Sequence, residues 1–213
     1  MRNCWLCLLL LLLALAFAGC AGDKAQLVET DLPQETAAVT TPPPRHLTPD
    51  QQLIKETLKK NGFGLKGAPP TVIVVHKQAR KLVLYQGLTP RKTYTVVLGL
   101  NPKGDKLCQG DTCTPEGVYR IKAKYPHPRW SRFIWLDYPN DQNWLKFARA
   151  KQAGRIPPDA AIGGHVGIHG THDELKNLKG ENWTRGCISM LNKDVDDLYN
   201  WVGEDTLVII EKQ

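Results

Sequence analysis

The sequence predicts a mostly β domain with one or two peripheral helices in the part of the chain that follows residue 47. Short runs rich in β-branched residues dominate this part, and two of them alternate apolar and polar residues with a period of two. The links between the first runs are short, as in hairpins of antiparallel strands. The regular strand–helix alternation of a parallel sheet is missing, so we expect mostly antiparallel pairing.

Seven runs are predicted to be strands. The runs 71–76 and 81–85 are separated only by residues 77–80, which predicts a hairpin. The alternating runs are 117–123 and 132–137, and their pattern is typical of strands that bury one face. The remaining predicted strands are 93–98, 165–169 and 206–210.

Three helices are predicted from capping signals, and the first of them is an accessory helix that precedes the β domain. The first begins with the capping box Thr48-Pro49-Asp50-Gln51 and ends at Asn61-Gly62. The second runs from Asp141 to about Gln152 behind a cap at Asn140, and the third is capped by Asn192. The side chains expected to face the core are Leu53, Ile54, Thr57 and Leu58 in the first helix, Trp144, Leu145, Phe147 and Ala148 in the second, and Val195, Leu198, Tyr199 and Val202 in the third.

The chain opens with a predicted export signal over residues 1–19. Arg2 precedes an uncharged apolar run over 6–17, and small residues follow this run. The run is shorter than the roughly 20 apolar residues of a membrane-spanning helix. We therefore favour a cleaved signal over the alternative, which is an uncleaved membrane anchor.

Ala18-Gly19-Cys20 resembles the lipobox of bacterial lipoproteins, although Phe17 stands where a leucine is commoner. The resemblance implies cleavage before Cys20 and acylation of this cysteine, and several acyl chains attach a protein stably to a membrane. No aspartate follows Cys20 directly, which by analogy with enteric lipoproteins favours the outer over the inner membrane, with a periplasmic domain. Residues 20–47 contain three consecutive prolines and no apolar period, so we expect a lipidated, disordered tether.

The rest of the chain divides into an accessory helix over 48–66 and a domain over 67–213. This domain is long enough to bury a core of its own. The formal net charge of the whole chain is +7 at pH 7, and its lysines and arginines are scattered. This pattern indicates a solvated surface, which would also suit an anionic polymer or an anionic membrane face. Export separates the protein from nucleic acid, so we expect no nucleic-acid partner.

The six cysteines have different expected states, and two of them lie in the predicted signal. Cys108 and Cys113 lie five residues apart in a turn-rich loop, so they can close a small disulfide in an oxidising compartment. A metal role for this pair would need further ligands, and no second pair lies nearby in the sequence. Cys187 is then left unpaired, which is the expected state of a nucleophile.

Cys187 follows His169 by 18 residues. A thiolate is the nucleophilic form of cysteine, and a neighbouring imidazole commonly produces it near neutral pH. Gly186 allows a tight backbone turn and brings N–H groups close to the atom that the sulfur attacks. This pair of residues therefore predicts a cysteine enzyme that transfers acyl groups.

Two other interpretations stay open for these residues. His165, His169, His172 and Cys187 could ligate zinc, although their spacing is not that of a helical zinc signature. Alternatively, Cys187 is a buried apolar residue and His169 a hydrogen-bonded core residue. The glycine before Cys187 and the export context favour the catalytic interpretation, so we expect no metal.

The motifs Ile168-His169-Gly170-Thr171 and Trp183-Thr184-x-Gly186-Cys187-Ile188-x-Met190 resemble the active-site signature of the L,D-transpeptidases with a YkuD-type catalytic domain. The run 109–121 is similar to the strand-entry motif of this family, and 136–140 is similar to its central sheet. The resemblance spans roughly residues 70–211. It implies an L,D-transpeptidase-like β-sandwich with peripheral helices, and an enzyme that needs no cofactor.

The resemblance implies a role for each matched residue. Cys187 would be the nucleophile, and His169 would accept and donate its proton. The carbonyl of Gly170 would orient the ring of His169. The backbone N–H groups of Arg185, Gly186 and Cys187 would form the oxyanion hole.

The resemblance also implies that Thr171, Thr184 and Arg185 contact the substrate. Arg185 stands where the family often has a histidine, and Ser189 stands where it often has an arginine, so the acceptor is open. The loop 155–164, which contains two prolines and two glycines, is a candidate lid over the site.

The substrate that the resemblance implies is a peptidoglycan stem tetrapeptide, which would lose D-Ala as it acylates Cys187. An amine of a second stem would then accept the acyl group, which gives a cross-link. Water as acceptor would make an L,D-carboxypeptidase, and a lysine of an envelope protein would be attached to the wall, with release as the reverse reaction. A wall-binding lipoprotein without turnover is the non-enzymatic alternative.

Overall fold

The computed structural model describes residues 46–63 and 67–211. The predicted signal over 1–19, the lipidation of Cys20 and nearly all of the predicted tether over 20–47 lie outside the described residues. Within the described residues, no helix is long and apolar enough to cross a lipid bilayer. The predicted boundaries of these N-terminal segments therefore stay predictions.

The strands of the described chain are β1 (Thr71–His76), β2 (Lys81–Gln86), β3 (Thr89–Thr95), β4 (Gly117–His127), β5 (Ser131–Leu136), β6 (Gly167–His169), β7 (Ile188–Ser189) and β8 (Leu207–Ile210). They form one sheet in the order β3-β2-β1-β8-β4-β5-β6-β7. The pairs β1–β8 and β6–β7 are parallel, and the other neighbouring pairs are antiparallel. The prediction of a mostly β, mostly antiparallel domain is confirmed.

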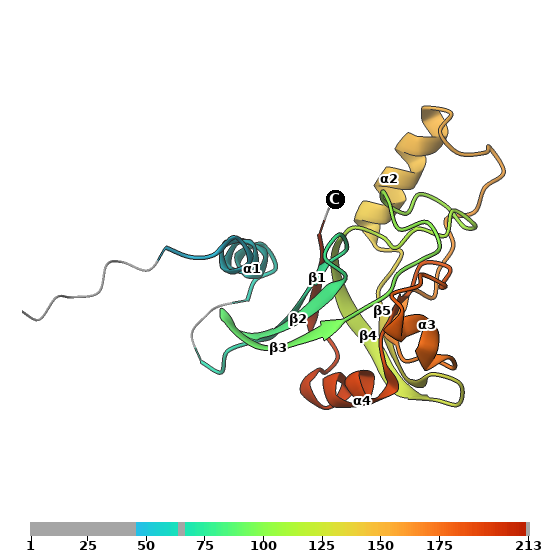
Figure 1. The fold of residues 1–213 in the computed structure, drawn as a ribbon. Helices are drawn as coiled ribbons and strands as arrows, with labels where there is room; N and C mark the ends of the chain where they lie inside the picture. The colour runs from blue at the N-terminus through green and yellow to red at the C-terminus, as the bar shows by residue number, and fades with distance from the viewer. Residues whose placement is uncertain (1–45, 64–66, 212–213) are drawn as a thin grey trace, which may run out of the picture. The chain divides into compact units, whose positions relative to one another are not determined.

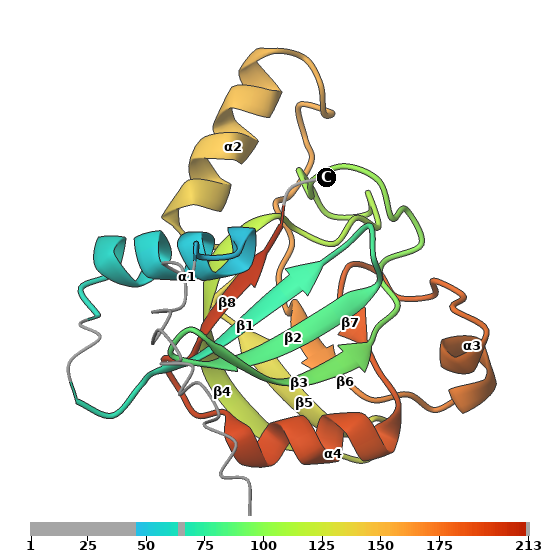
Figure 2. The same cartoon turned by 60° about the vertical axis from the view of Figure 1, so that its left-hand side comes forward.

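The helices of the described chain are α1 (Pro49–Lys60), α2 (Asp141–Gln152), α3 (Glu174–Leu178) and α4 (Asn192–Trp201). α1 begins as predicted, because Thr48 and Gln51 form a capping box at its start. Its residues Ile54 and Leu58 pack against one face of the sheet in a cluster that includes Val74. Figure 2 shows α1 in front of the sheet, near the ends of β1 and β8.

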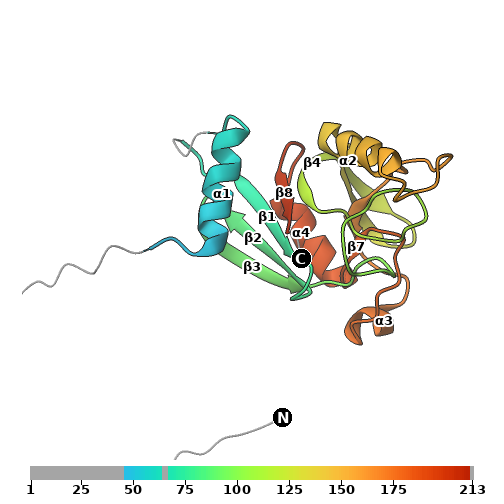
Figure 3. The same ribbon diagram turned by 90° about the horizontal axis from the view of Figure 1, so that it is seen from above.

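The sheet curls until its two ends meet. Beyond β3, Val97 exchanges two backbone hydrogen bonds with Ser189 of β7, with N–O distances of 2.8 and 2.9 Å. Figures 1 and 3 show β1–β3 on one side of the domain and β4 and β5 on the other, with α4 at the open end between them. The main core cluster fills the space between the two sides, with Leu84 from the first and Ile134 from the second both 0% exposed. This curled sheet is the form that the predicted sandwich takes.

α2 differs from the prediction in the face that it buries. It starts behind Asn140 and ends at Gln152 as predicted, but only Asn143 and Ala150 of its residues are buried. Trp144 and Leu145, which were expected to face the core, are 50% and 49% exposed. Asn143 lies inward because its Nδ2 donates to the buried hydroxyl of Tyr119 over 2.9 Å. A polar anchor therefore orients this helix, which projects away from the sheet in Figure 1.

α4 differs from the prediction at its start. Leu191 occupies the N-cap position without a side-chain cap, and Asn192 is the first helical residue. The side-chain oxygen of Asn192 instead accepts the backbone N–H of Thr171 over 2.8 Å. Val195 and Leu198 are buried in the core as predicted. The short helix α3 and the two-residue strand β7 were not predicted, since neither is long enough to show a period.

A buried ion pair holds the long loop between β3 and β4. Nζ of Lys77, directly after β1, lies 2.9 Å from Oε1 of Glu116, and the two residues are 1% and 6% exposed. The same ammonium group donates to the carbonyls of Gly104 and Thr114. Because a buried charge needs partners, these bonds fix residues 104–116 against the sheet.

Glu116→Ala is expected to lower the free energy of unfolding by about 3 kcal/mol, because it leaves the buried ammonium of Lys77 without its carboxylate. Urea unfolding followed by circular dichroism measures this change. Glu56→Ala on the exposed face of α1 is the matched control and should change the free energy by less than about 0.5 kcal/mol. Equal effects of the two substitutions would contradict the role given to the ion pair.

Candidate active site

The predicted base and the predicted nucleophile belong to two neighbouring strands. His169 is the last residue of β6, and Cys187 directly precedes β7. β6 and β7 run parallel, with Ile168 opposite Ile188 and His169 opposite Ser189. Side chains alternate between the two faces of a sheet, and the two isoleucines point into the core, where both are 0% exposed. His169 and Cys187, which directly precedes β7, therefore project from the same face of adjacent strands.

The ring of His169 is held in one orientation. Its Nδ1 lies 2.6 Å from the carbonyl oxygen of Gly170. A carbonyl oxygen can only accept, so Nδ1 carries a proton and, in the neutral ring, Nε2 is the nitrogen that can accept one. This is the hydrogen bond that the family resemblance assigns to Gly170, and it gives His169 the tautomer that a general base needs.

Aromatic rings enclose His169, which is 1% exposed. Trp130 stacks on its ring with centroids 4.3 Å apart, and the ring of Phe133 lies nearly parallel to it at 5.8 Å. Trp183 presents its edge at 5.6 Å. These rings exclude water from the imidazole. The sequence did not identify Trp130 or Phe133, since only the pairing of β5 with β6 brings them to the site.

Burial favours the neutral form of both members of the pair. Burial lowers the pKa of His169 to about 4, although the hydrogen bond to Gly170 acts in the opposite direction. Burial raises the pKa of Cys187 to about 11, although a backbone hydrogen bond from Gly167 and the charge of Lys106 oppose this change. Both shifts disfavour a preformed thiolate and imidazolium in the free protein. Such a pair can transfer the proton of the thiol as the sulfur attacks.

The turn before Cys187 requires a glycine. Gly186 has a φ of +132°, and a Cβ at this position would lie 2.7 Å from the carbonyl oxygen of Cys113. The N–H of Gly186 donates to Oγ1 of Thr184 over 3.2 Å, and this hydroxyl donates to the carbonyl of Cys187 over 2.6 Å. Of the three N–H groups predicted to form the oxyanion hole, that of Gly186 is thus engaged within the turn. Those of Arg185 and Cys187 stay predicted donors.

Thr171 and Thr184 are buried, at 1% and 4% exposed, and their hydroxyls bond within the chain. Oγ1 of Thr171 donates to the carbonyl of Asp173 and accepts its N–H, both over 3.0 Å. Both threonines hold backbone turns, which differs from the substrate contact predicted for them. Arg185 is exposed and lines a pocket, so its contact with substrate stays a prediction.

This pocket has a volume of about 650 Å³ and reaches the surroundings of the nucleophile. His165 lines it, and the carbonyl oxygen of His165 lies 3.5 Å from Sγ of Cys187, which donates to it. The other lining residues are Lys106, Gln109, Gly110, Thr112, Gly163, Gly164 and Arg185. Gly163 and Gly164 belong to the predicted lid over 155–164, whose movement stays a prediction.

The loop along one side of this pocket carries Cys108 and Cys113, which are both free thiols in the structure. The disulfide predicted between them is therefore absent. The carboxylate of Asp111 closes the loop instead, since it accepts the backbone N–H groups of Leu107, Cys108 and Cys113 over 2.7, 3.0 and 3.1 Å. It also pairs with Nζ of Lys106 at 2.7 Å.

The side chains considered for zinc are His165, His169, His172 and Cys187, and their ligand atoms do not converge on one point. Within residues 46–63 and 67–211, the group that does converge is Asp50, His76 and Glu211. Both ring nitrogens of His76 are already bonded, Nδ1 to Glu211 at 2.5 Å and Nε2 to Asp50 at 3.2 Å. This group joins α1 to the ends of β1 and β8, and we assign it no metal.

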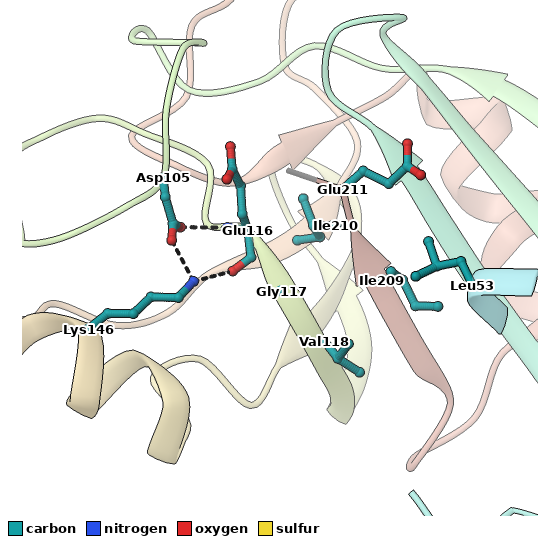
Figure 4. Close-up of a pocket in the computed structure, with 9 residues that line it drawn as sticks. All are labelled: Leu53, Asp105, Glu116, Gly117, Val118, Lys146, Ile209, Ile210 and Glu211. Carbon is teal, nitrogen blue, oxygen red and sulfur yellow. Dashed lines mark hydrogen bonds and ion pairs between the residues drawn. The ribbon is translucent and has the colours of Figure 1, made fainter. Parts of the chain in front are cut away.

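A second pocket, of about 540 Å³, does not include the pair (Figure 4). Figure 4 shows an apolar side, formed by Leu53, Val118 and Ile209, and a polar side on which Lys146 lies between Asp105 and the backbone of Glu116. Nζ of Lys146 is 2.5 Å from Oδ2 of Asp105. The residues that line this pocket include no Cys, Ser, Thr or His, whereas the first pocket is lined by His165, to whose carbonyl the thiol of Cys187 donates. We therefore place the candidate site beside the first pocket.

The comparisons with known proteins agree on one family. The family model described as YkuD, L,D-transpeptidase catalytic domain, matches residues 70–210. No curated protein matches the chain.

Solved structures give a weaker likeness. The helical cell shape determining protein Pgp2 from Campylobacter jejuni is 21% identical, with 76% of this chain and 56% of that chain covered and a TM-score of 0.49. The L,D-transpeptidase from Xylanimonas cellulosilytica is 12% identical, with 73% and 68% covered and a TM-score of 0.44. This chain spans little more than half of the length of Pgp2, at 56%.

The stability of the domain is expected to fall as the pH falls from about 6.5 to about 4, because the unfolded chain binds a proton on His169 that the folded chain rejects. Below the unfolded pKa the unfolded state holds more protons, so the free energy of unfolding decreases with falling pH. The loss from this one group is about 3 kcal/mol and is complete near pH 4.

Urea unfolding between about pH 4 and pH 7 tests this expectation in the wild type and in His169→Gln. The variant should show a shallower decline, because glutamine does not titrate. Parallel declines in the two proteins would contradict the buried, neutral state of His169.

Proposed function

Because this chain belongs to the L,D-transpeptidase catalytic domain family over residues 70–210, we propose that it is a cysteine acyltransferase that acts on the stem peptides of peptidoglycan. The observation that carries this proposal is the placement of His169 and Cys187 on one face of adjacent strands, with Nδ1 of His169 bonded to Gly170. A thiol and an oriented imidazole on one face of adjacent strands support this proposal, because covalent catalysis by cysteine uses a base beside the nucleophile.

In the first half-reaction, Sγ of Cys187 attacks the carbonyl carbon between the third residue of the stem and D-Ala. Nε2 of His169 takes the thiol proton as the C–S bond forms. The N–H groups of Arg185 and Cys187 donate to the oxyanion. When the C–N bond breaks, His169 returns the proton to the amine of D-Ala, and a thioester on Cys187 remains.

In the second half-reaction, an amine attacks the thioester and gives its proton to Nε2 of His169. The C–S bond then breaks, and the sulfur leaves and takes the proton back. With an amine of a second stem, the product is a cross-link. With water it is a shortened stem, and with a lysine of an envelope protein it is an attached protein. All three outcomes share one acyl-enzyme.

Arg185 supplies a cation at the mouth of this reaction site. Its side chain is exposed and lines the pocket of about 650 Å³. A guanidinium group can bind a carboxylate through two hydrogen bonds, and stem peptides carry free carboxylates. We therefore assign Arg185 to substrate binding in place of Thr171 and Thr184, whose hydroxyls are engaged within the chain.

The proposed location follows from the N-terminal segment. Cleavage before Cys20 and its acylation would anchor the protein in a membrane that faces the periplasm, with the outer membrane favoured. The tether over 20–47 would hold the domain near the wall. A wall-facing enzyme of this kind needs no cofactor and no nucleic-acid partner.

Cys187→Ala is expected to abolish the release of D-Ala from purified tetrapeptide muropeptides, because it removes the thiol that forms the thioester. His169→Gln is expected to lower the rate by about a hundredfold or more, since it removes the general base. Mass spectrometry of the products measures both effects and identifies the acceptor. Cys108→Ala, which removes a thiol outside the pair, should keep wild-type activity.

Intact-protein mass spectrometry adds a direct test of the intermediate. A mass increase that is present in wild type and absent in Cys187→Ala supports the acyl-enzyme. Activity in both proteins would remove the role assigned to Cys187. Binding of peptidoglycan without turnover would favour the non-enzymatic alternative.

A further inference from the structure

We propose that Trp183, Asn177 and Ser189 form a chain of hydrogen bonds that fixes the carbonyl of Gly170 and thereby selects the tautomer of His169. These three are positioning residues, since none of them reaches the reacting atoms in the mechanism above. The proposal rests on the proposed function for its effect on turnover. Its effect on the imidazole and on the thiol can be measured without a substrate.

The direction of the chain follows from its first member. Nε1 of Trp183 donates to Oδ1 of Asn177 over 2.9 Å. An indole N–H can only donate, so it fixes which end of the amide faces Trp183. The opposite end, Nδ2 of Asn177, must then act as the donor toward its other partner.

That other partner is the hydroxyl of Ser189, which accepts from Nδ2 of Asn177 over 3.0 Å. Ser189 is 0% exposed, so no water competes for its hydroxyl. Having accepted one hydrogen bond, the hydroxyl directs its own proton to the carbonyl oxygen of Gly170, 3.0 Å away. Each hydrogen bond in the chain is therefore donated in the same direction, from Trp183 toward Gly170.

Two donors thus meet on one oxygen, the hydroxyl of Ser189 and Nδ1 of His169 at 2.6 Å. The peptide that carries this oxygen has no room to move. A Cβ on Gly170 would lie 2.4 Å from the carbonyl oxygen of Trp130 and 2.2 Å from Oδ1 of Asn192. The N–H of the same peptide, which is that of Thr171, donates to Oδ1 of Asn192 over 2.8 Å. The oxygen is therefore held in place from both ends of the peptide.

The fixed carbonyl determines which ring nitrogen of His169 can act as the base. The fixed oxygen of Gly170 needs a proton on Nδ1 of His169, which leaves Nε2 as the acceptor for the thiol. The chain begins at Trp183, four residues before Cys187, and the edge of this indole also contacts the ring of His169 at 5.6 Å. The segment that carries the nucleophile thereby helps to hold the base. Ser189 fills the position at which the family often has an arginine, and here its short hydroxyl completes the chain.

Ser189→Ala removes the last link, and Trp183→Phe removes the first while it keeps an aromatic ring against His169. The ring nitrogens of His169 are observed by 15N NMR in the full chain at pH 7. Wild type should show one tautomer, with the proton on Nδ1, and both variants should show a mixture. Ser189→Thr keeps the hydroxyl and should restore the single tautomer. Asn200→Ala on the exposed end of α4 is the matched control for a lost polar side chain and should match wild type.

The reactivity of the thiol is the second readout. Alkylation of Cys187 by iodoacetamide should slow about tenfold in Ser189→Ala, because a smaller fraction of imidazole can accept the thiol proton at Nε2. With the stem tetrapeptide, kcat should fall about tenfold to a hundredfold with KM within about twofold of wild type. A purely structural role would lower the melting temperature without this division between kcat and KM.

The outcomes separate the two proposals. If Ser189→Ala folds like wild type and leaves both the tautomer and the alkylation rate unchanged, the positioning role is overturned. If the tautomer and alkylation respond as expected but wild type releases no D-Ala, the positioning role stands and the proposed function fails. If Ser189→Ala does not fold, Trp183→Phe decides by the same two measurements.

Discussion

The parallel pairing of β6 with β7 is the constraint on which the rest of the site depends. It sets the register that puts His169 opposite Ser189 and Cys187 one position before the paired strand. Ile168, before His169, and Ile188, after Cys187, are both buried in the core, so a shift of one residue would turn His169 into the core and Ile168 out of it. The apolar core therefore holds the arrangement of the candidate site as well as the fold.

Burial shifts the pKa values of the two candidate groups in opposite directions, because it lowers that of His169 and raises that of Cys187. It favours the neutral imidazole and the neutral thiol, with pKa values of about 4 and about 11. A raised thiol pKa disfavours the thiolate, so attack by the sulfur would need a correctly oriented Nε2 to take its proton. The bond from Nδ1 of His169 to Gly170 provides this orientation, and the buried hydroxyl of Ser189 supports the same carbonyl.

The wall of the pocket depends on charges that are distant in the sequence. Lys77, directly after β1, forms an ion pair with Glu116, directly before β4. Lys106 pairs with Asp111 within the loop between β3 and β4. The carbonyl of Cys113 then lies so close to Gly186 that no side chain fits at that position. A buried ion pair and an aspartate turn thus shape the surface beside the nucleophile, where the sequence led us to expect a disulfide.

The sequence by itself determined the class of fold, the start of α1 and the glycine in the turn before Cys187, and it predicted His169 and Cys187 as the candidate pair. These features are local, because they depend on strand period, capping residues and short motifs. The buried face of α2, the partner of Asn192, the raised pKa of Cys187 and the chain from Trp183 to Ser189 were decided only by the tertiary structure. Each of them depends on which distant groups exclude water or offer a hydrogen bond, and a linear pattern does not contain that information.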